Sequence, residues 1–437
     1  MITTLIGKTF LKAYNDKYSK SYSAKEYFEK EYFELFFNHP KYMQWVTNSP
    51  FVQMKTGQKP ETLCLEDRLE KLQNLYEKAG NGSADASFAL GYPASETKEY
   101  ASTSGLVSDI AIEATEEDIF YSWIGSGLGI GVSGGFTLLI NDENILLETY
   151  AGWQHYRKYL NDKALQKLRG NQINSWNGQW LTYKLGKGYR DDFDFTTLTK
   201  EGVFKAESTL AEVNTVNWSN LFFSLSQFYP DKILNAYVYS FGQTNKTIGF
   251  IPIHLKSGRK LKEVFKKIFH SDKEFETKDF QSLFGIHIKR ACELGNIGLH
   301  ALRPDSLKKY MNEEKSISFK KEEDFINYQS YKTWLVAMLS KNKEEVTEYT
   351  LQIAELIKRY RLGAKGTERK TLIEKRLFGE TSKKIFIAAL ADMLGGIEGD
   401  DLIAIKNLKN EIHLMTNEEF GYFNTLLKFD YAFVEKQ

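Results

Sequence analysis

Apolar side chains recur at helical spacing near both ends of the chain. Within residues 23–37 (SAKEYFEKEYFELFF) they form one stripe, which His39-Pro40 interrupts: Tyr27, Phe28, Tyr32, Leu35 and Phe36. Residues 344–361 repeat the i, i+3, i+4 spacing with Val346, Tyr349, Ile353, Leu356, Ile357 and Tyr360. This spacing is typical of amphipathic helices that bury one face. We therefore expect helices through the first eighty residues and from about residue 311 to the end.

The middle of the chain has a different pattern. From about residue 110 to 252, short β-rich runs are separated by Asn, Asp and Gly, and the clearest are FTLLI, ILLETY, AYVYSF and TIGFIPI. Such runs predict short strands joined by turns. The fold class that follows is α+β: a mixed body of helices and short antiparallel strands over residues 1–310, and a C-terminal helical bundle over 311–437.

Length and composition narrow the class of protein. A chain of 437 residues predicts two or three domains, and a hydrophobic content of 42% excludes a disordered chain. Cys64 and Cys292 lie far apart and no C-x-x-C occurs, which excludes a disulfide scaffold and a zinc ribbon and fits a reducing compartment. The first residues lack the pattern of a signal peptide, and no window resembles a membrane span. We expect a cytoplasmic protein without membrane association.

The stretch WIGSGLGIGVSGGF contains a G-x-G-x-x-G pattern at Gly129, Gly131 and Gly134. A dinucleotide-binding loop needs a strand before it and a helix after it. EDIFYSWI can supply a strand before it, but residues 136–150 predict a strand, an Asn-Asp turn and another strand. We therefore favour a segment whose backbone lies close to nucleic acid or to a neighbouring subunit. A nucleotide-dependent enzyme using the Gly125–Gly135 loop is the alternative.

Motifs for catalysis or metal binding are missing from the sequence. The seven histidines form no i, i+4 pair and no H-E-x-x-H, and no G-x-S-x-G lies between a predicted strand and helix. No Lys-Ser/Thr pair follows the glycines, which excludes a P-loop. We expect no catalytic residue, no metal and no cofactor.

Positive charge is concentrated in one segment of a nearly neutral chain. The net charge is +1, yet residues 358–384 contain ten Lys or Arg and three Glu. Such a concentration favours a local polyanion site, whereas an ordinary solvated helix face is the alternative. With two lysines from a second basic run, the candidates for contact with a nucleic-acid backbone are Arg361, Lys365, Arg369, Lys370, Lys383, Lys384, Lys260 and Lys266.

A third feature is the amide-rich segment 168–190, LRGNQINSWNGQWLTYKLGKGYR. Amides among cations and indole rings suit the recognition of base edges, particularly in a minor groove. A polar loop whose amides cap its own turns is an equal alternative. The candidate DNA-motif contacts are Asn171, Gln172, Asn174 and Asn177.

The C-terminal half resembles a known family in several stretches, namely FGIHIKRACELGNIGLHALRPDSLKKYM, NYQSYKTWLVAMLSKN, YRLGAKGTERKTLIEKRLF and SKKIFIAALADML. Together with GFTLLINDENILLETYAGWQHYRKYL, they resemble the large subunit of type I CRISPR Cascade complexes, nearest the I-B branch. Some relatives carry paired C-x-x-C motifs that this chain lacks, so the resemblance does not imply a zinc site here.

The resemblance implies a non-enzymatic subunit of a crRNA-containing complex. Such a subunit recognises a protospacer-adjacent motif in double-stranded target DNA, assists R-loop formation and holds the displaced strand along its C-terminal bundle. Its surface would receive a helicase-nuclease, or transposition proteins in a variant system. A basic adaptor for RNA or acidic proteins is a further alternative.

Overall fold

The computed structural model divides the chain into two compact units. The N-terminal unit comprises Met1–Leu255 with Cys292–Ile297, and the C-terminal unit comprises Lys256–Ala291 with Gly298–Gln437. The division therefore lies near residue 255, and not after residue 310 as we expected. The structure describes all residues except 81–83, 96–106, 109–111, 187, 208–209, 241–245, 270–283, 287, 305, 313, 316, 340–342, 380–381 and 437.

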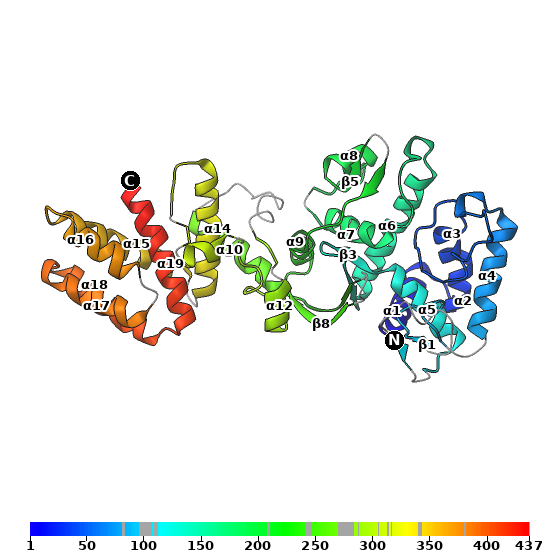
Figure 1. Cartoon of the computed structure of the whole chain (residues 1–437), viewed down its shortest axis with the longest axis horizontal. Coiled ribbons are helices and arrows are strands. Elements are labelled where there is room, and N and C mark those ends of the chain that lie inside the picture. The colour runs from blue at the N-terminus through cyan, green and yellow to red at the C-terminus, as the bar shows by residue number, and fades with distance from the viewer. Residues whose placement is uncertain are drawn as a thin grey trace. The chain divides into compact units, whose positions relative to one another are not determined.

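Helices make up most of the N-terminal unit (Figure 1). They are α1 (Ile2–Tyr18), α2 (Ala24–Tyr27), α3 (Phe33–Phe36), α4 (Leu65–Gly80), α5 (Glu116–Gly127), α6 (Glu143–Asn161), α7 (Ile173–Lys184), α8 (Phe195–Lys200) and α9 (Trp218–Phe228). A π-helical turn, η1 (Phe28–Tyr32), joins α2 to α3, and two 3-10 turns are η2 (Pro60–Thr62) and η4 (Lys163–Leu165). The aromatic stripe predicted over residues 23–37 is buried in this unit at Tyr27, Phe28, Tyr32 and Phe36.

The fold class is α+β, as the sequence predicted. A four-stranded antiparallel sheet has the order β3-β4-β7-β8, with β3 (Ile130–Val132), β4 (Phe136–Ile140), β7 (Ile233–Ser240) and β8 (Lys246–His254). A smaller antiparallel pair is β5 (Phe204–Ala206) with β6 (Ala211–Val213), and a parallel pair is β1 (Ala94–Ser95) with β2 (Val107–Ser108). Of the four predicted runs, FTLLI and TIGFIPI are strands, and so is AYVYS, the described part of AYVYSF.

Two segments that the sequence analysis assigned to strands are helices. ILLETY lies inside α6, where the Asp142 carboxylate accepts hydrogen bonds from the backbone N–H groups of Asn144 and Ile145. EDIFYSWI lies inside α5, which begins with a capping box formed by Thr115 and Asp118. In both cases a side chain that caps a helix N-terminus decides between two readings of the same apolar run.

The C-terminal unit is built from helices. They are α10 (Lys256–Phe269), α13 (Leu307–Met311), α14 (Glu322–Leu339), α15 (Lys343–Leu362), α16 (Glu368–Thr371), α17 (Lys383–Met393), α18 (Asp400–Leu414) and α19 (Asn417–Lys436), with the π-helical turn η5 (Leu372–Leu377) and the 3-10 turn η6 (Leu394–Gly396). The helix α12 (Ile288–Leu294) is divided between the two units after Ala291. The predicted stripe on α15 is buried at Ile353, Leu356, Ile357 and Tyr360. None of the helices in the described ranges has the length and apolar character that crossing a membrane requires.

Candidate nucleic-acid interface

The glycine segment packs against the rest of its own unit. Helix α5 precedes it and the β3-β4 hairpin follows it, which is the reverse of the order that a dinucleotide loop needs. A Cβ atom on Gly129 would lie 2.6 Å from the Asn174 amide nitrogen, and one on Gly131 would lie 2.9 Å from the Asn174 carbonyl carbon. Gly134 adopts φ +90 in the hairpin turn. At Gly129 and Gly131 the close approach is therefore made to α7 of the same unit, whereas we expected nucleic acid or a neighbouring subunit there. The order of the elements disfavours the nucleotide-loop alternative.

Two of the predicted motif contacts serve the packing of these glycines. Asn177 is fully buried, and its amide nitrogen donates to the carbonyl oxygens of Gly127 and Gly129, both at 2.8 Å. Its amide oxygen accepts a hydrogen bond from the Trp153 indole at 3.1 Å. The Asn174 amide likewise donates to the Gly129 carbonyl oxygen at 2.8 Å. The expectation that the buried Asn177 contacts DNA is therefore wrong, and both amides satisfy backbone groups at the α5-β3 junction.

The other two predicted amides lie at the start of α7. The side-chain oxygen of Gln172 accepts a hydrogen bond from the backbone N–H of Val213 at 3.0 Å, which ties the start of the helix to β6. Asn171 is exposed, and within the part of the chain that the structure describes its amide has no hydrogen-bond partner. Of the four predicted amides, Asn171 is the most exposed, Gln172 and Asn174 are partly buried, and Asn177 is buried.

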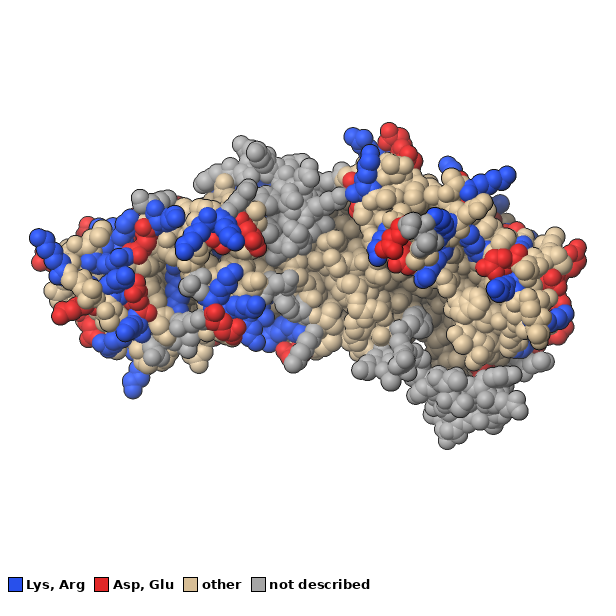
Figure 2. Space-filling model, turned by 45° about the horizontal axis from the view of Figure 1, so that its top comes forward, with Lys and Arg blue, Asp and Glu red and all other residues tan. Residues whose placement is uncertain are grey.

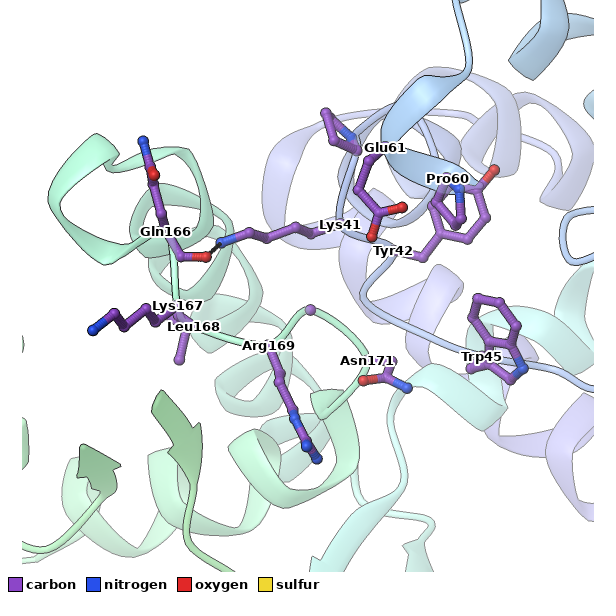
Figure 3. Close-up of a pocket in the computed structure, with 12 residues that line it drawn as sticks. Lys41, Tyr42, Trp45, Pro60, Glu61, Gln166, Lys167, Leu168, Arg169 and Asn171 are labelled. Atoms are coloured by element: carbon purple, nitrogen blue, oxygen red, sulfur yellow. Dashed lines mark hydrogen bonds between the residues drawn. The ribbon is translucent and has the colours of Figure 1, made fainter. Parts of the chain in front are cut away.

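Asn171 lies at the edge of a pocket of about 460 Å³, which we call the Lys41–Asn171 pocket. Three segments of the N-terminal unit line it, and their residues are Pro40, Lys41, Tyr42, Trp45, Pro60, Glu61, Gln166, Lys167, Leu168, Arg169, Gly170 and Asn171. In Figure 3, Arg169 and Asn171 lie between the Gln166–Leu168 side of the pocket and the side formed by Tyr42, Pro60 and Trp45. Its lining carries three cations and one carboxylate, Glu61.

Backbone pairing with β6 explains why two of these cations face solvent. The backbone of Arg169 donates to the carbonyl oxygen of Ala211, and Ala211 donates to the carbonyl oxygen of Lys167, both at 3.1 Å. In an extended segment alternate side chains point to opposite sides, so Leu168 is buried while Lys167 and Arg169 are exposed. Arg169 also pairs with Glu212 at 3.6 Å, and such an exposed pair is weak enough for a ligand to compete with it.

Lys41 holds two of the lining segments together. Its ammonium group donates to the carbonyl oxygens of Leu165 at 3.3 Å and Gln166 at 2.8 Å (Figure 3). Burial lowers the pKa of Lys41 below its ordinary value. Next to this contact, a Cβ atom on Gly170 would lie 2.5 Å from the carbonyl oxygen of Tyr42, so the two loops can approach each other because residue 170 is glycine.

A buried arginine adds positive charge behind the pocket wall. Arg157 is 8% exposed, and one guanidinium nitrogen donates to the carbonyl oxygen of Lys41 at 3.3 Å. Its Nε and Nη2 atoms are buried without a hydrogen-bond partner in the described part of the structure. Burial lowers the pKa of Arg157 to about 9, so the group remains charged at neutral pH. Burial, followed by the charge of Arg157, lowers the pKa of the nearby His39 to about 4.

The basic segment at the C-terminus is less available than its sequence suggested. Arg361 forms an ion pair with Glu435, Arg369 donates to the carbonyl oxygen of Tyr360 at 2.6 Å, and Lys383 donates to the carbonyl oxygen of Met415. Among the eight predicted backbone contacts, these three therefore have partners within the unit. On the face of the C-terminal unit that Figure 2 shows, Lys and Arg side chains lie among Asp and Glu side chains.

The remaining predicted cations lie nearer to solvent. Lys365 and Lys384 are exposed, and no ion pair of either is present among the described residues. Lys370 is exposed and lies 3.7 Å from Glu374 one turn away, a weak pair. On α10, Lys266 is exposed and Lys260 is partly exposed, opposite a buried face of Leu261, Val264 and Phe265.

The sequence analysis missed Lys41, Trp45 and Arg157. Trp45 is 48% exposed, and an indole in a segment without helical or strand periodicity was a signal that could have drawn attention to this loop. Nothing in the local sequence connects Lys41 with Arg169, because 127 intervening residues separate them. Compared with known proteins, this sequence matches no family model, and neither a curated protein nor a solved structure matches it at a significant level.

Proposed function

We propose that this chain is the non-catalytic, DNA-binding large subunit of a crRNA-guided type I CRISPR effector complex, and that the Lys41–Asn171 pocket contacts nucleic acid. It recognises a short motif in target DNA, assists opening of the duplex and receives a helicase-nuclease or transposition proteins. The family resemblance supports membership of the effector complex, and the pocket supports the contact with nucleic acid.

The observation that supports nucleic-acid binding by the pocket is the combination of side chains in its lining. Lys167 and Arg169 face solvent from one extended segment, the Asn171 amide is available beside them, and Trp45 exposes an indole. Cations attract phosphates, amides bond base edges, and an indole face stacks on a base. Exposed lysines of the C-terminal unit, including Lys365 and Lys384, supply further positions for a strand backbone.

The experiment that tests the assembly is affinity purification of the tagged full-length chain from its native cells. A small RNA and several other proteins co-purify, and the complex prefers duplex DNA with a defined short motif over single-stranded RNA. Purification of the chain alone with a preference for single-stranded RNA would support the basic-adaptor alternative. A melting-temperature rise with NAD or ATP would support the enzyme.

A charge-matched comparison tests the pocket. Arg169→Gln and Lys167→Gln each remove one pocket cation, whereas Lys12→Gln removes one exposed cation from α1. Each pocket substitution weakens DNA binding and lowers the slope of log affinity against log salt by about one unit, because one phosphate contact is lost. Equal effects from all three substitutions would reject the pocket as the contact.

A further inference from the structure

The Lys41–Asn171 pocket is concave, and this shape restricts the form of nucleic acid that can enter it. A duplex is read in its grooves, where an inserted helix or strand reaches the base edges. A hollow cannot enter a groove, but it can receive a group that projects from the nucleic acid. A base projects when it is unpaired and turned out of the stack.

We infer that the pocket binds a single unpaired nucleotide, an inference that rests on the proposed function and specifies its ligand. A volume of about 460 Å³ suits a ligand of nucleotide size. The groups in the lining match the parts of one nucleotide: Trp45 for the base face, Asn171 for the base edge, and Arg169 for the phosphate.

The charge behind the wall favours the same ligand. Arg157 is buried with two guanidinium nitrogens that lack hydrogen-bond partners among the described residues, and it remains positively charged at neutral pH. Its third nitrogen contacts the carbonyl oxygen of Lys41, a residue of the lining. Since charges interact more strongly where water is excluded, a phosphate in the pocket is stabilised by Arg157 without touching it.

Tryptophan fluorescence gives a direct signal from this pocket. The seven tryptophans all lie in the described part of the chain; Trp45 is 48% exposed, and the other six are at most 7% exposed. Stacking of a base on Trp45 quenches its emission, whereas the buried indoles do not meet the ligand. The probes are a blunt DNA duplex, the same duplex with one unpaired nucleotide, and that duplex with an abasic site in place of the unpaired nucleotide.

The full-length chain is titrated with each probe, and binding is also followed by anisotropy of a labelled strand. The duplex with the unpaired nucleotide quenches Trp45 and binds most tightly. Trp45→Ala weakens its binding roughly 5- to 150-fold, the range for loss of one base stack. Trp45→Phe keeps most of the affinity, since a ring remains. Phe250→Ala, which removes a 63% exposed ring outside the pocket, leaves it unchanged.

Two kinds of failure are distinguishable. Equal binding and quenching by the blunt or abasic duplex would overturn the inference, and so would DNA binding that Trp45→Ala leaves intact; in both cases the proposed function stands. Absence of anisotropy change with every probe, for the chain and for its purified complex, would overturn the proposed function as well.

Discussion

A buried ion pair at the centre of the C-terminal unit provides the sharpest test of its packing. The Lys332 ammonium and the Asp430 carboxylate lie 2.7 Å apart with side-chain exposures of 3% and 0%. The same carboxylate accepts hydrogen bonds from the Thr350 hydroxyl at 2.7 Å and the Tyr328 hydroxyl at 3.1 Å. One side chain of α19 thus joins α14 and α15, and burial raises the pKa of Tyr328 far above its ordinary value.

Asp430→Asn tests the charge while preserving the size of the side chain. The amide oxygen can still accept from Thr350 or Tyr328, but Lys332 becomes a buried ammonium without its counter-charge. Removing one partner of a buried pair costs about 3–5 kcal/mol in the free energy of unfolding. For a unit of roughly 150–250 residues, each kcal/mol lowers Tm by about 2–4 °C, so Tm falls by about 6–20 °C.

Scanning calorimetry of the full chain measures this change, because the two compact units supply an internal comparison. The transition of the C-terminal unit moves down and that of the N-terminal unit stays in place. In Lys332→Met/Asp430→Asn no buried charge remains, and we expect at least about 2 kcal/mol to be regained over Asp430→Asn. A cost below about 1 kcal/mol for Asp430→Asn, or a double variant no more stable than it, would refute the reasoning.

Three other changes test the N-terminal unit and the proposed interface. Gly125→Ala lowers the free energy of unfolding, measured by chemical denaturation, by at least about 2 kcal/mol, because its Cβ would overlap the Thr3 carbonyl oxygen. Gly80 has open space around it, so the control Gly80→Ala changes this free energy little. The free energy of unfolding falls as pH decreases from about 6.5 to 4, because His39 binds a proton in the unfolded chain but not in the folded one, where its pKa is lowered to about 4. Denaturation curves measured across that range give the dependence of this free energy on pH, and His39→Gln reduces that dependence. Lys365→Gln weakens the complex's binding to all DNA sequences alike and lowers the salt slope by about one unit, and a sequence-selective loss would contradict a backbone contact.

The spacing of apolar residues was sufficient to predict an element where one face of that element is buried over several helical turns or at alternate strand positions. The stripes that include Tyr32 and Ile357 predicted helices, and those helices bury these side chains. The run ILLETY does not distinguish a strand from a helix, because a run of six apolar-rich residues fits a buried strand and a helix equally well. The deciding residue is Asp142, which the sequence analysis placed in a turn and which instead caps α6.

Residue type alone could not separate an amide that serves the fold from one that is available to a ligand. Asn171 and Asn177 lie six positions apart in the same amide-rich segment, yet one is exposed and the other fully buried. What differs is the neighbouring backbone: the carbonyl groups of Gly127 and Gly129 lie against the α7 face that carries Asn177 and accept hydrogen bonds from its amide. The position of these carbonyl groups depends on how α5 packs, and the sequence of segment 168–190 contains no information about that packing.

The pocket illustrates the same limit for a site built from distant segments. Local sequence already contained the alternation that exposes Lys167 and Arg169 and the glycine at position 170, but each was uninformative without its partner loop. The Lys41 ammonium supplies that connection by bonding two carbonyl oxygens across the chain. Because the acceptors are uncharged carbonyl oxygens, these hydrogen bonds hold the two loops together and leave the positive charge of Lys41 without a counter-charge there. The contact that shapes the pocket therefore also leaves it electropositive, which is the property on which binding of a phosphate depends.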